Sequence, residues 1–529
     1  MSQQFRLASS LVLCLAVATT GPSPTAQSQA LVALRTRAEG TDYRETSRYD
    51  DVLAFLKTVD EVSPIVHVTT FGSSFEGRAL PLAVAGRVAN ASPAAVRASG
   101  KLRVYIQANV HAGEVEGKEA MQAMLRDIAL GRYASWMDSM VLLVAPIYNA
   151  DGNERVSMTS RGPQHGPIAG AGQRANAQGL NINRDYMKLE TPEARAMVTL
   201  LGDYDPHVML DLHTTNGSRH AYHLTFETPN NPAVDPAIVR LARERWMPAV
   251  TRAIKSTDGW DYRAYGNVEG EPPARTWNTV EDLPRYSHNY WGVRNRVGIL
   301  METYSYLTFA DRISTARRFV EEVLHFADAN AAEIRRTIEA ADARSLIGER
   351  LSLRSQPRRS LEMVEILMGA TAQEVNPLSG RVMERRLDVR TPERMWEYAT
   401  FESVETERVP SAYYLPQELR AAVEHLQAHG ISLALLPEAA TLTLEEFAIQ
   451  SSEVTAQAFE NHRERTVTGR YRQVERRLAA GTWRVSMRQP LARLAFQLLE
   501  PRSGDGLVAW NTFDAALKGA SAYPILRTP

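Results

Sequence analysis

A histidine and two glutamates stand on a short turn of small residues, in the segment NVHAGEVEGKEA at positions 109–120. His111 and Glu114 are three positions apart on this turn, and His213 ends a later apolar run, PHVMLDLH. Two imidazoles and one carboxylate leave the fourth position of a tetrahedral zinc ion open, which is typical of catalytic rather than structural sites. We therefore predict one Zn²⁺ ion held by His111, Glu114 and His213. The alternative for each residue taken alone is a hydrogen-bonded structural role.

The elements that must position these residues alternate between apolar strands and amphipathic helices. Strands are predicted at KLRVYIQANV, SMVLLVAPIYNADG, PHVMLDLHTT and VGILMETYS, and helices at EGKEAMQAMLRDIALG and PEARAMVTLLGDY. Such alternation favours an α/β sandwich with a parallel or mixed central sheet flanked by helices. His111, His213 and Glu302 all follow or end predicted strands, where open α/β sheets bind their ligands.

Five motifs, in order, resemble those of the zinc carboxypeptidases of the carboxypeptidase A type: HAGE, YNADG, NINRD, DLHTTNG and GILMETYS. An upstream segment, FGSSFEGRALPLAVAG, is similar to that family's entry hairpin. The resemblance covers about residues 42–340. It implies a carboxypeptidase A-like sandwich around a mixed sheet and a metallocarboxypeptidase that hydrolyses C-terminal peptide bonds of peptide substrates.

The resemblance also implies roles for individual residues. His111, Glu114 and His213 match the zinc ligands, and Glu302 in LMETYS matches the general base. A carboxylate in that role takes a proton from the metal-activated water and delivers one to the leaving amine. One departure concerns Asn181, which stands where the family usually has the aspartate that orients a zinc-bound histidine. A neutral amide accepts a hydrogen bond less strongly, so the tuning of His111 is expected to differ.

Substrate binding is assigned to NINRD by the same resemblance. Asn183 and Arg184 match the pair that binds the terminal carboxylate of the substrate. The planar guanidinium of arginine suits this task because it donates two parallel hydrogen bonds to a carboxylate. Local pairing of Arg184 with Asp185 is the alternative.

Two further positions of the family pattern are matched less directly. An arginine that stabilises the oxyanion is expected between YNADG and NINRD. We predict Arg161, with Arg155 and Arg174 as rivals. For the substrate-capping tyrosine we predict Tyr286, with Tyr290 as a rival, although both lie close to Glu302 in the chain.

Three segments are predicted along the 529 residues. Residues 1–30 have the pattern of a secretory signal peptide, with Arg6 before a short apolar run and Ala26 and Ala30 as candidate cleavage sites. Residues 42–345 form the predicted catalytic domain. After the linker-like RSQPRRS, residues 355–529 are predicted to form an α+β accessory domain without a readable motif.

Bulk composition limits the partners. The formal net charge is −1, without a long run of one sign, so neither nucleic acid nor an anionic membrane is favoured as a partner. Cys14 is the only cysteine and lies within the predicted signal peptide, so the metal ligands must be His, Asp or Glu. The protein is expected to be secreted or periplasmic, with no membrane attachment after signal removal. The sequence does not indicate an oligomeric state.

Two other functions fit part of the same pattern. A zinc amidase or deacylase would keep the metal and Glu302 but act on acyl-amino acids or cell-wall peptides. A peptide-binding protein with an inactive site would use the C-terminal segment instead. All four catalytic positions carry competent residues, which argues against that last alternative.

Overall fold

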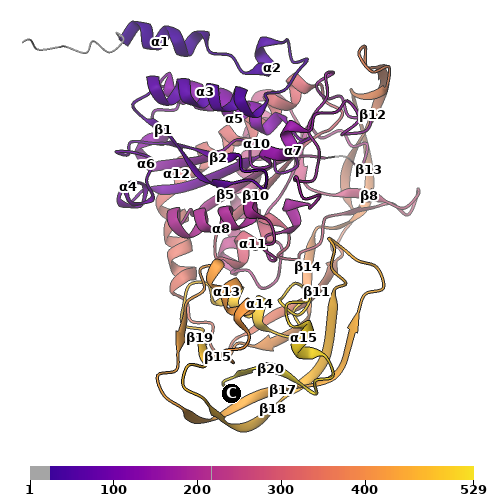
Figure 1. The fold of residues 1–529 in the computed structure, drawn as a ribbon. Coiled ribbons are helices and arrows are strands. Elements are labelled where there is room, and N and C mark those ends of the chain that lie inside the picture. Colours follow the sequence, from indigo (N-terminus) through magenta and orange to yellow (C-terminus); the bar gives the residue numbers. More distant parts are fainter. Residues whose placement is uncertain (1–23, 216) are drawn as a thin grey trace, which may run out of the picture.

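The computed structural model describes residues 24–215 and 217–529 and is built around one eight-stranded sheet (Figure 1). The strand order is β1-β2-β4-β3-β5-β10-β6-β7. The four strands β4, β3, β5 and β10 run parallel, whereas β1–β2, β2–β4 and β10–β6 pair antiparallel. The predicted mixed sheet is therefore confirmed. The strands are β1 (Val66–Ser73), β2 (Ala79–Ala85), β3 (Leu102–Ala108), β4 (Met140–Ala145), β5 (Val208–Thr214), β6 (Leu224–Glu227), β7 (Tyr262–Ala264) and β10 (Val297–Thr303).

Helices cover both faces of this sheet, as the alternating sequence pattern predicted (Figure 1). One layer contains α3, α5, α10 and α12, and α8 and α11 lie against the other face. Every residue of β3, β4 and β5 is buried, as expected for parallel strands covered on both sides. The helices of this region are α1 (Pro24–Ala33), α2 (Arg37–Gly40), α3 (Tyr49–Val62), α4 (Pro93–Ala98), α5 (Glu116–Ala129), α6 (Trp136–Ser139), α7 (Ala150–Glu154), η1 (Ile182–Arg184), α8 (Pro192–Tyr204), α9 (Pro236–Val239), η2 (Arg240–Trp246), α10 (Met247–Asp258), α11 (Ser287–Val293) and α12 (Phe309–Ala343).

The C-terminal segment forms the additional α+β region that the sequence predicted. Its main sheet is antiparallel, in the order β16-β19-β15-β20-β17-β18, and β11 pairs separately with β14. The elements are β11 (Arg350–Arg358), β12 (Val364–Val375), β13 (Val382–Tyr398), β14 (Thr400–Arg408), β15 (Ala412–Leu415), α13 (Arg420–Ala428), β16 (Leu433–Leu435), β17 (Ala440–Val454), β18 (Arg465–Leu478), β19 (Trp483–Ser486), α14 (Ala492–Leu499), α15 (Asp514–Leu517) and β20 (Ala522–Arg527).

One sheet joins the two predicted domains. Strand β13 pairs with β9 (Thr276–Asn278), which pairs with β8 (Asn267–Glu269), so strands from both sides of residue 345 share hydrogen bonds. The boundaries 42–345 and 355–529 remain predictions, but the segments they separate are not independent in packing.

The N-terminal prediction falls mostly outside the described residues. Of the predicted signal peptide 1–30, residues 1–23 are not described, and Pro24–Ala33 forms α1. Leu31 on that helix is buried against the core. Within the described part of the chain, none of the helices combines the length and the apolar character that crossing a bilayer requires.

Two histidines, the buried His429 and the half-buried His425, join α13 to the predicted catalytic domain. His429 Nδ1 lies 2.7 Å from the Tyr290 hydroxyl, and its Nε2 lies 3.1 Å from His425 Nε2. His425 Nε2 is also 2.8 Å from the Met187 carbonyl oxygen. Burial lowers the pKa of His425 to about 4 and holds the pKa of His429 well below its usual value.

This pair predicts that the protein loses stability in weak acid. An unfolded chain takes up protons on these rings below pH ~6.5, whereas the folded protein does so only near its lowered pKa values. Each ring should therefore lower the free energy of unfolding by up to about 1.4 kcal/mol per pH unit as the pH falls from ~6.5 towards 4. Urea unfolding at pH 7, 6 and 5 measures this dependence. A free energy of unfolding that stays constant over this range would contradict it.

Candidate metal centre and active site

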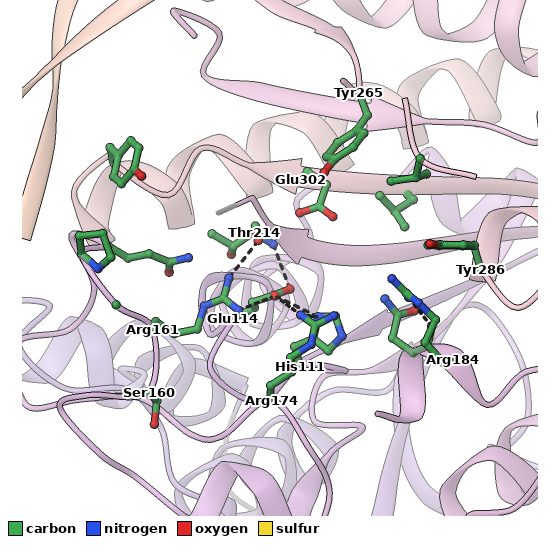
Figure 2. Close-up of a pocket in the computed structure, with 17 residues that line it drawn as sticks. His111, Glu114, Ser160, Arg161, Arg174, Arg184, Thr214, Tyr265, Tyr286 and Glu302 are labelled. Atoms are coloured by element: carbon green, nitrogen blue, oxygen red, sulfur yellow. Dashed lines mark hydrogen bonds and ion pairs between the residues drawn. The ribbon is translucent and has the colours of Figure 1, made fainter. Parts of the chain in front are cut away.

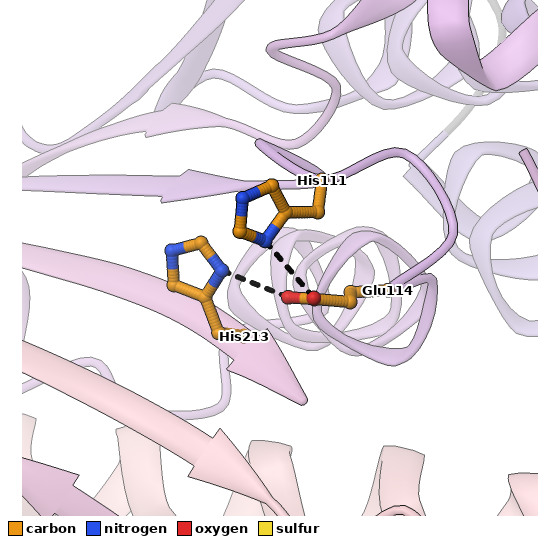
Figure 3. Close-up of side chains that lie close together, drawn as sticks. All are labelled: His111, Glu114 and His213. Atoms are coloured by element: carbon orange, nitrogen blue, oxygen red, sulfur yellow. Dashed lines mark hydrogen bonds and ion pairs between the residues drawn. The ribbon is translucent and has the colours of Figure 1, made fainter. Parts of the chain in front are cut away.

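The candidate site lies where three neighbouring parallel strands end. His111 follows β3 on a turn that starts at Asn109, whose φ of 61° is left-handed. His213 and Glu302 are the penultimate residues of β5 and β10, and they are direct partners in the ladder between these strands. Figure 3 shows His111 and His213 directed at the Glu114 carboxylate from different elements. The sheet topology therefore brings together residues that are far apart in sequence.

The three predicted ligands converge with their metal-binding atoms inward. One ligand atom of each of His111, Glu114 and His213 lies within 4.8 Å of the other two, and all three residues are buried. His111 Nδ1 lies 2.9 Å from Glu114 Oε1, and His213 Nδ1 lies 2.8 Å from Glu114 Oε2. Within the described residues this is the group of histidines and carboxylates arranged for a metal ion.

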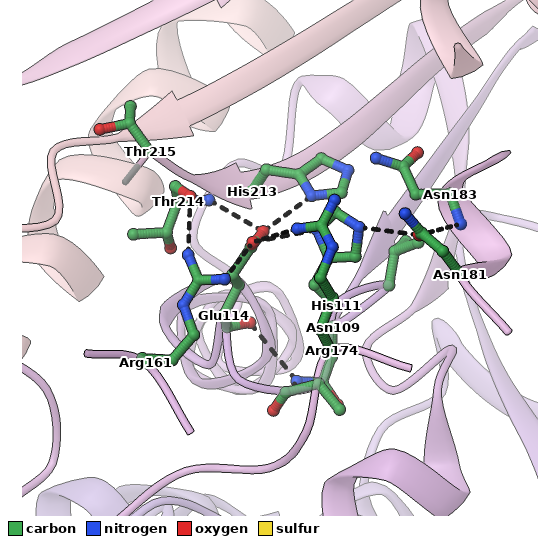
Figure 4. Close-up of polar contacts among 12 residues, drawn as sticks. Asn109, His111, Glu114, Arg161, Arg174, Asn181, Asn183, His213, Thr214 and Thr215 are labelled. Atoms are coloured by element: carbon green, nitrogen blue, oxygen red, sulfur yellow. Dashed lines mark hydrogen bonds and ion pairs between the residues drawn. The ribbon is translucent and has the colours of Figure 1, made fainter. Parts of the chain in front are cut away.

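The outer nitrogen of His111 fixes its tautomer. Asn181 Oδ1 accepts a hydrogen bond from the Asn183 backbone N–H and lies 3.1 Å from His111 Nε2, so Nε2 must donate to it (Figure 4). This leaves a lone pair on Nδ1 facing a carboxylate oxygen, and two acceptors at this distance need a proton or a cation between them. Burial lowers the pKa of His111 to about 4, which favours the cation at neutral pH. The residues thus fit a zinc ion.

His213 is held from its other side by an aspartate. Its Nε2 lies 2.9 Å from Asp211 Oδ2, and both residues are buried. Although burial alone would lower it, the carboxylates of Asp211 and Glu114 hold the pKa of His213 well above its usual value. Burial would raise the pKa of Glu114, but His111 and the Arg161 guanidinium hold it well below its usual range. A zinc ion bound at His213 Nδ1 would displace the proton there and replace its single positive charge by two, facing the same carboxylates.

Glu302 stands beside the three ligands without joining them. It lines the cavity with Leu300, from the same face of β10. Burial, aided by the negative charge of Glu114, raises the pKa of Glu302 to about 8. Its Oε2 atom has no hydrogen-bond partner among the described residues. A bound divalent cation would oppose this rise by favouring the carboxylate form. The carboxyl is therefore close to the metal position and ready to exchange a proton.

Asn183 and Arg184, the predicted carboxylate-binding pair, lie on η1 at one end of the same cavity. Asn183 Oδ1 is buried without a partner among the described residues. Arg184 stacks on the ring of Tyr286 at 4.0 Å and donates to the Asn183 carbonyl oxygen. Asp185 instead accepts hydrogen bonds from the backbone and hydroxyl of Thr191, the residue that caps the start of α8. The alternative of local pairing between Arg184 and Asp185 is therefore not what the structure contains.

Two of the three candidate oxyanion arginines reach the site. Arg161 is 3.0 Å from Glu114 Oε1 and donates to the Thr214 carbonyl oxygen. Arg174 Nη1 lies 3.2 Å from His111 Nδ1, and its side chain is 44% exposed towards the cavity. Arg155 bonds Glu76 away from the cavity.

The tyrosine candidates are also separated by the structure. Tyr286 lines the cavity, whereas Tyr290 is fully buried with its hydroxyl at His429. Tyr265, which the sequence did not single out, lines the cavity beside Glu302 (Figure 2). Burial, with Glu302 nearby, raises the pKa of Tyr265, so its hydroxyl remains a donor at neutral pH. No motif around Tyr265 indicated this position.

Sequence reasoning also missed the role of the second glutamate of the opening segment. Glu116 begins α5, where the helix N-terminus favours a negative charge. Its Oε1 accepts hydrogen bonds from the hydroxyls of Thr214 and Thr303, the last residues of β5 and β10. Arg312 on α12 lies beside its other oxygen, and both charged residues are buried. Glu116 therefore ties together the strand ends that carry His213 and Glu302.

Replacing Glu116 by alanine is expected to destabilise the protein by about 3 kcal/mol or more, because the buried Arg312 loses its neighbouring carboxylate charge and two buried hydroxyls lose their acceptor. Zinc affinity should fall as well, since the end of β5, which carries His213, loses the hydrogen bond from Thr214 to Glu116. Urea unfolding and zinc competition with a chelator measure the two effects. Glu116→Gln keeps an acceptor for both threonines and should lose less of each. Equal losses in the two variants would contradict the role of the threonine bonds.

The cavity that contains these groups has a volume of about 510 Å³. In Figure 2, Ser160 and Arg161 lie on one side of Glu114 and Glu302, and Arg184 and Tyr286 lie on the other. It is lined by His111, Glu114, Ser160, Arg161, Gly162, Pro163, Gln164, Arg174, Asn183, Arg184, Thr214, Tyr265, Val280, Tyr286, Leu300, Glu302 and Tyr306. Apart from the zinc ligand and Glu302, its charged groups are all arginines, which suits a substrate with a negative terminus.

Comparisons with known proteins agree with this geometry. A sequence model of the zinc carboxypeptidase family matches residues 52–281. Carboxypeptidase 2 of Trichophyton tonsurans is 25% identical over 451 residues, 81% of this chain and 77% of that protein. Carboxypeptidase 2 of Trichophyton rubrum is 25% identical over 477 residues, 86% of this chain and 81% of that protein.

Among solved structures, carboxypeptidase A from Helicoverpa armigera is 17% identical, with a TM-score of 0.42. That alignment covers 58% of this chain and 81% of the other. A metallo-carboxypeptidase from Burkholderia cenocepacia is 18% identical, with a TM-score of 0.40, over 54% of this chain and 70% of the other.

Proposed function

Because the chain belongs to the zinc carboxypeptidase family, we propose that it removes single residues from the C-terminus of peptides, with Glu302 as general base. The observation that carries this proposal is one cavity that combines three features: the His111–Glu114–His213 centre, the Glu302 carboxyl with one oxygen unbonded, and the Arg184 guanidinium, which has no carboxylate partner among the described residues. A metallohydrolase needs the first two features, and a carboxypeptidase also needs a group such as the third to bind the terminal carboxylate.

When bound, the zinc ion would polarise the scissile carbonyl and make water a nucleophile near neutral pH. Glu302 is proposed to take a proton from the attacking water and to deliver it to the leaving amine. Burial raises the pKa of Glu302 and a bound cation would oppose that rise, and these opposing effects support proton exchange near neutral pH. Tyr265 is a further donor beside this carboxyl.

Negative charge that develops on the carbonyl oxygen needs a positively charged partner. We propose that Arg161 and Arg174 supply it together. Arg174 is the more exposed of the two, and among residues 24–215 and 217–529 its ion-pair partner is Glu114, 3.9 Å away. Arg161 keeps Glu114 ionised and oriented through its 3.0 Å ion pair.

Arg184 is proposed to bind the terminal carboxylate, with the Asn183 amide as a second donor. The stacking of Tyr286 on the guanidinium would hold its plane in place and leave its edge for the substrate. Tyr286 is proposed to cover the bound C-terminal residue. A site that binds the terminal carboxylate places the last peptide bond at a fixed distance from it, next to the metal. This distinguishes an exopeptidase from an endopeptidase.

We predict that Arg184→Met raises KM for a peptide with a free C-terminal carboxylate by about 30-fold and changes kcat much less. The reason is that the carboxylate loses its charged partner in the bound substrate and in the transition state alike. Steady-state kinetics on a blocked peptide and on its C-terminal amide measure the effect. The wild type should discriminate between acid and amide, and the variant should not. Retained discrimination would exclude Arg184 as the carboxylate-binding residue.

The substrate class is tested by products. The zinc-loaded protein is incubated with a blocked dipeptide, an N-acyl amino acid and a muropeptide stem, and released amines are identified. Release of the C-terminal amino acid from the dipeptide supports the carboxypeptidase. Cleavage of the acyl compound or the stem alone would make the protein an amidase or deacylase instead.

Export to the periplasm or the medium is proposed from the signal-peptide pattern in residues 1–30. N-terminal sequencing of the protein recovered outside the cytoplasm tests this. Cleavage after Ala26 or Ala30 supports the proposal, and an intact N-terminus in the cytoplasm contradicts it.

A further inference from the structure

The C-terminal hairpin formed by β12 and β13 reaches the wall of the active-site cavity. The Glu384 backbone N–H donates to the Pro163 carbonyl oxygen at 2.8 Å, and the Arg386 N–H donates to the Tyr306 carbonyl oxygen at 2.6 Å. Pro163 and Tyr306 both line the cavity, although they come from different loops of the catalytic region. The hairpin therefore joins two wall segments that have no strand pairing of their own.

Strand β13 uses its free edge for these bonds. Successive N–H groups of a strand point to opposite edges, so residues 384 and 386 present theirs on the same side. The other edge of this part of β13 pairs with β12, as in Glu384 opposite Gln373. Side chains of β12 and of the turn after it add to the contact. His165 Nε2 is 2.9 Å from Glu374 Oε2, and Asn376 donates to the Ile168 carbonyl oxygen.

The base of the hairpin is in direct backbone contact with the catalytic region. The Ala221 N–H donates to the Leu367 carbonyl oxygen at 2.8 Å, and the Gly369 N–H donates to that of Arg219. A Cβ atom at Gly369 would lie 2.6 Å from the His220 carbonyl oxygen, so no side chain fits between them. Together with the contacts at Pro163 and Tyr306, this fixes the hairpin along its length, on the side of the molecule where β8 also lies (Figure 1).

The part of the cavity wall that the hairpin contacts lies across the cavity from the carboxylate-binding end. Arg184 and Tyr286 mark one end of the cavity, whereas Ser160 and Arg161 lie on the opposite side of Glu302 (Figure 2). A peptide with its carboxylate at Arg184 and its last bond at the metal centre must extend its preceding residues towards the opposite side. This step rests on the proposed function.

We propose that the β12–β13 hairpin holds the wall against which the substrate residues upstream of the scissile bond bind. Pro163, Gln164 and Tyr306 are the cavity residues that would contact them. Binding energy from parts of a substrate remote from the reacting bond increases kcat/KM only if the wall that provides it is fixed. The C-terminal region thus acts in substrate selection and makes the enzyme favour extended peptides over dipeptides.

The test compares a blocked dipeptide with a blocked tetrapeptide that ends in the same two residues, using the full-length zinc-loaded protein. For the wild type, kcat/KM should be about tenfold or more higher for the tetrapeptide. Glu384→Pro removes the N–H that binds Pro163, and proline is tolerated where the N–H faces away from the ladder. This variant should lose about tenfold on the tetrapeptide and keep its kcat/KM on the dipeptide.

Glu384→Gln is the matched control, because it keeps the N–H and the size of the side chain, and it should retain the preference for length. Glu374→Gln is a second variant at a partly exposed position that does not endanger folding. It weakens the contact with His165 and should reduce the tetrapeptide kcat/KM by about threefold, in line with the loss of a surface ion pair.

Equal losses on both substrates would mean that the hairpin only supports the fold, and the proposal would be overturned. A wild type without any preference for length would overturn it too. Failure of the wild type to release an amino acid from either peptide would refute the carboxypeptidase function itself, which is a different outcome.

Discussion

Replacing Glu302 by glutamine is expected to lower kcat by about 10²-fold or more, while the protein still binds zinc. Glutamine has the shape of glutamate but cannot take up the proton of the attacking water. Glu302 neighbours His213 in the strand ladder without belonging to the three-residue metal group, so its replacement should leave the ligands in place. Turnover of a blocked peptide gives kcat, and titration with a chelator gives the zinc affinity.

Glu227→Gln is the matched control for this variant. Glu227 is, like Glu302, a glutamate on the central sheet. It lies buried in the strand next to β10, and its carboxylate accepts hydrogen bonds from Thr228 and Thr279. It does not line the cavity, so kcat should stay within about threefold of the wild type. If Glu302→Gln kept more than a tenth of wild-type kcat with zinc bound, the assignment of the general base would fail.

The second large effect separates the two arginines of the site. Arg174→Gln should lower kcat by about 10²–10³-fold, the usual cost of removing one donor to a developing oxyanion. Its zinc affinity should not fall, because Arg174 lies 3.9 Å from Glu114 and its 3.2 Å contact is with the same His111 nitrogen that the metal would occupy. Arg161→Gln should lower kcat and also weaken zinc binding, because Glu114 loses the 3.0 Å ion pair that keeps it ionised.

Arg155→Gln provides the control, since Arg155 belongs to the same loop region but bonds Glu76 outside the cavity. It should leave both kcat and the zinc affinity near wild-type values. An Arg174 variant with wild-type kcat would leave charge stabilisation to Arg161 alone. If neither arginine variant changed kcat, the proposed pair would be wrong.

Together, the two comparisons would assign one residue to proton transfer and one to charge stabilisation by independent measurements. Proton transfer and charge stabilisation act at different atoms of the substrate, so the variants should also differ in their dependence on pH. Loss of Glu302 should flatten the pH profile of kcat, whereas loss of Arg174 should lower it at every pH.

Much of the site could be predicted from the sequence because its residues belong to short local patterns. His111 and Glu114 share one turn, His213 and Glu302 end apolar runs, and parallel strands of a buried sheet must end at the same edge. That the metal group assembles follows from those patterns. The departure at Asn181 was also readable, and its amide oxygen does lie against His111 Nε2.

The sequence did not determine which of several residues of the same type reaches the site. Arg155, Arg161 and Arg174 lie on one long connection, and only the path of that connection sends two of them to the cavity and one to the surface. The same holds for Tyr286 and Tyr290, of which one lines the cavity and the other is buried at His429.

The amino-acid sequence by itself determined the metal site of this protein, because the three ligand residues and the proposed base Glu302 follow from residue type at or just after strand ends that local periodicity defines. Tertiary structure decided what surrounds that chemistry. Glu116, on a helix, bonds threonines at the ends of two strands. Tyr265 lines the cavity from a loop distant in sequence, and the β12–β13 hairpin of the C-terminal region contacts the cavity wall. Contacts of this kind depend on how layers pack at long sequence separation, and no local pattern of residues records them.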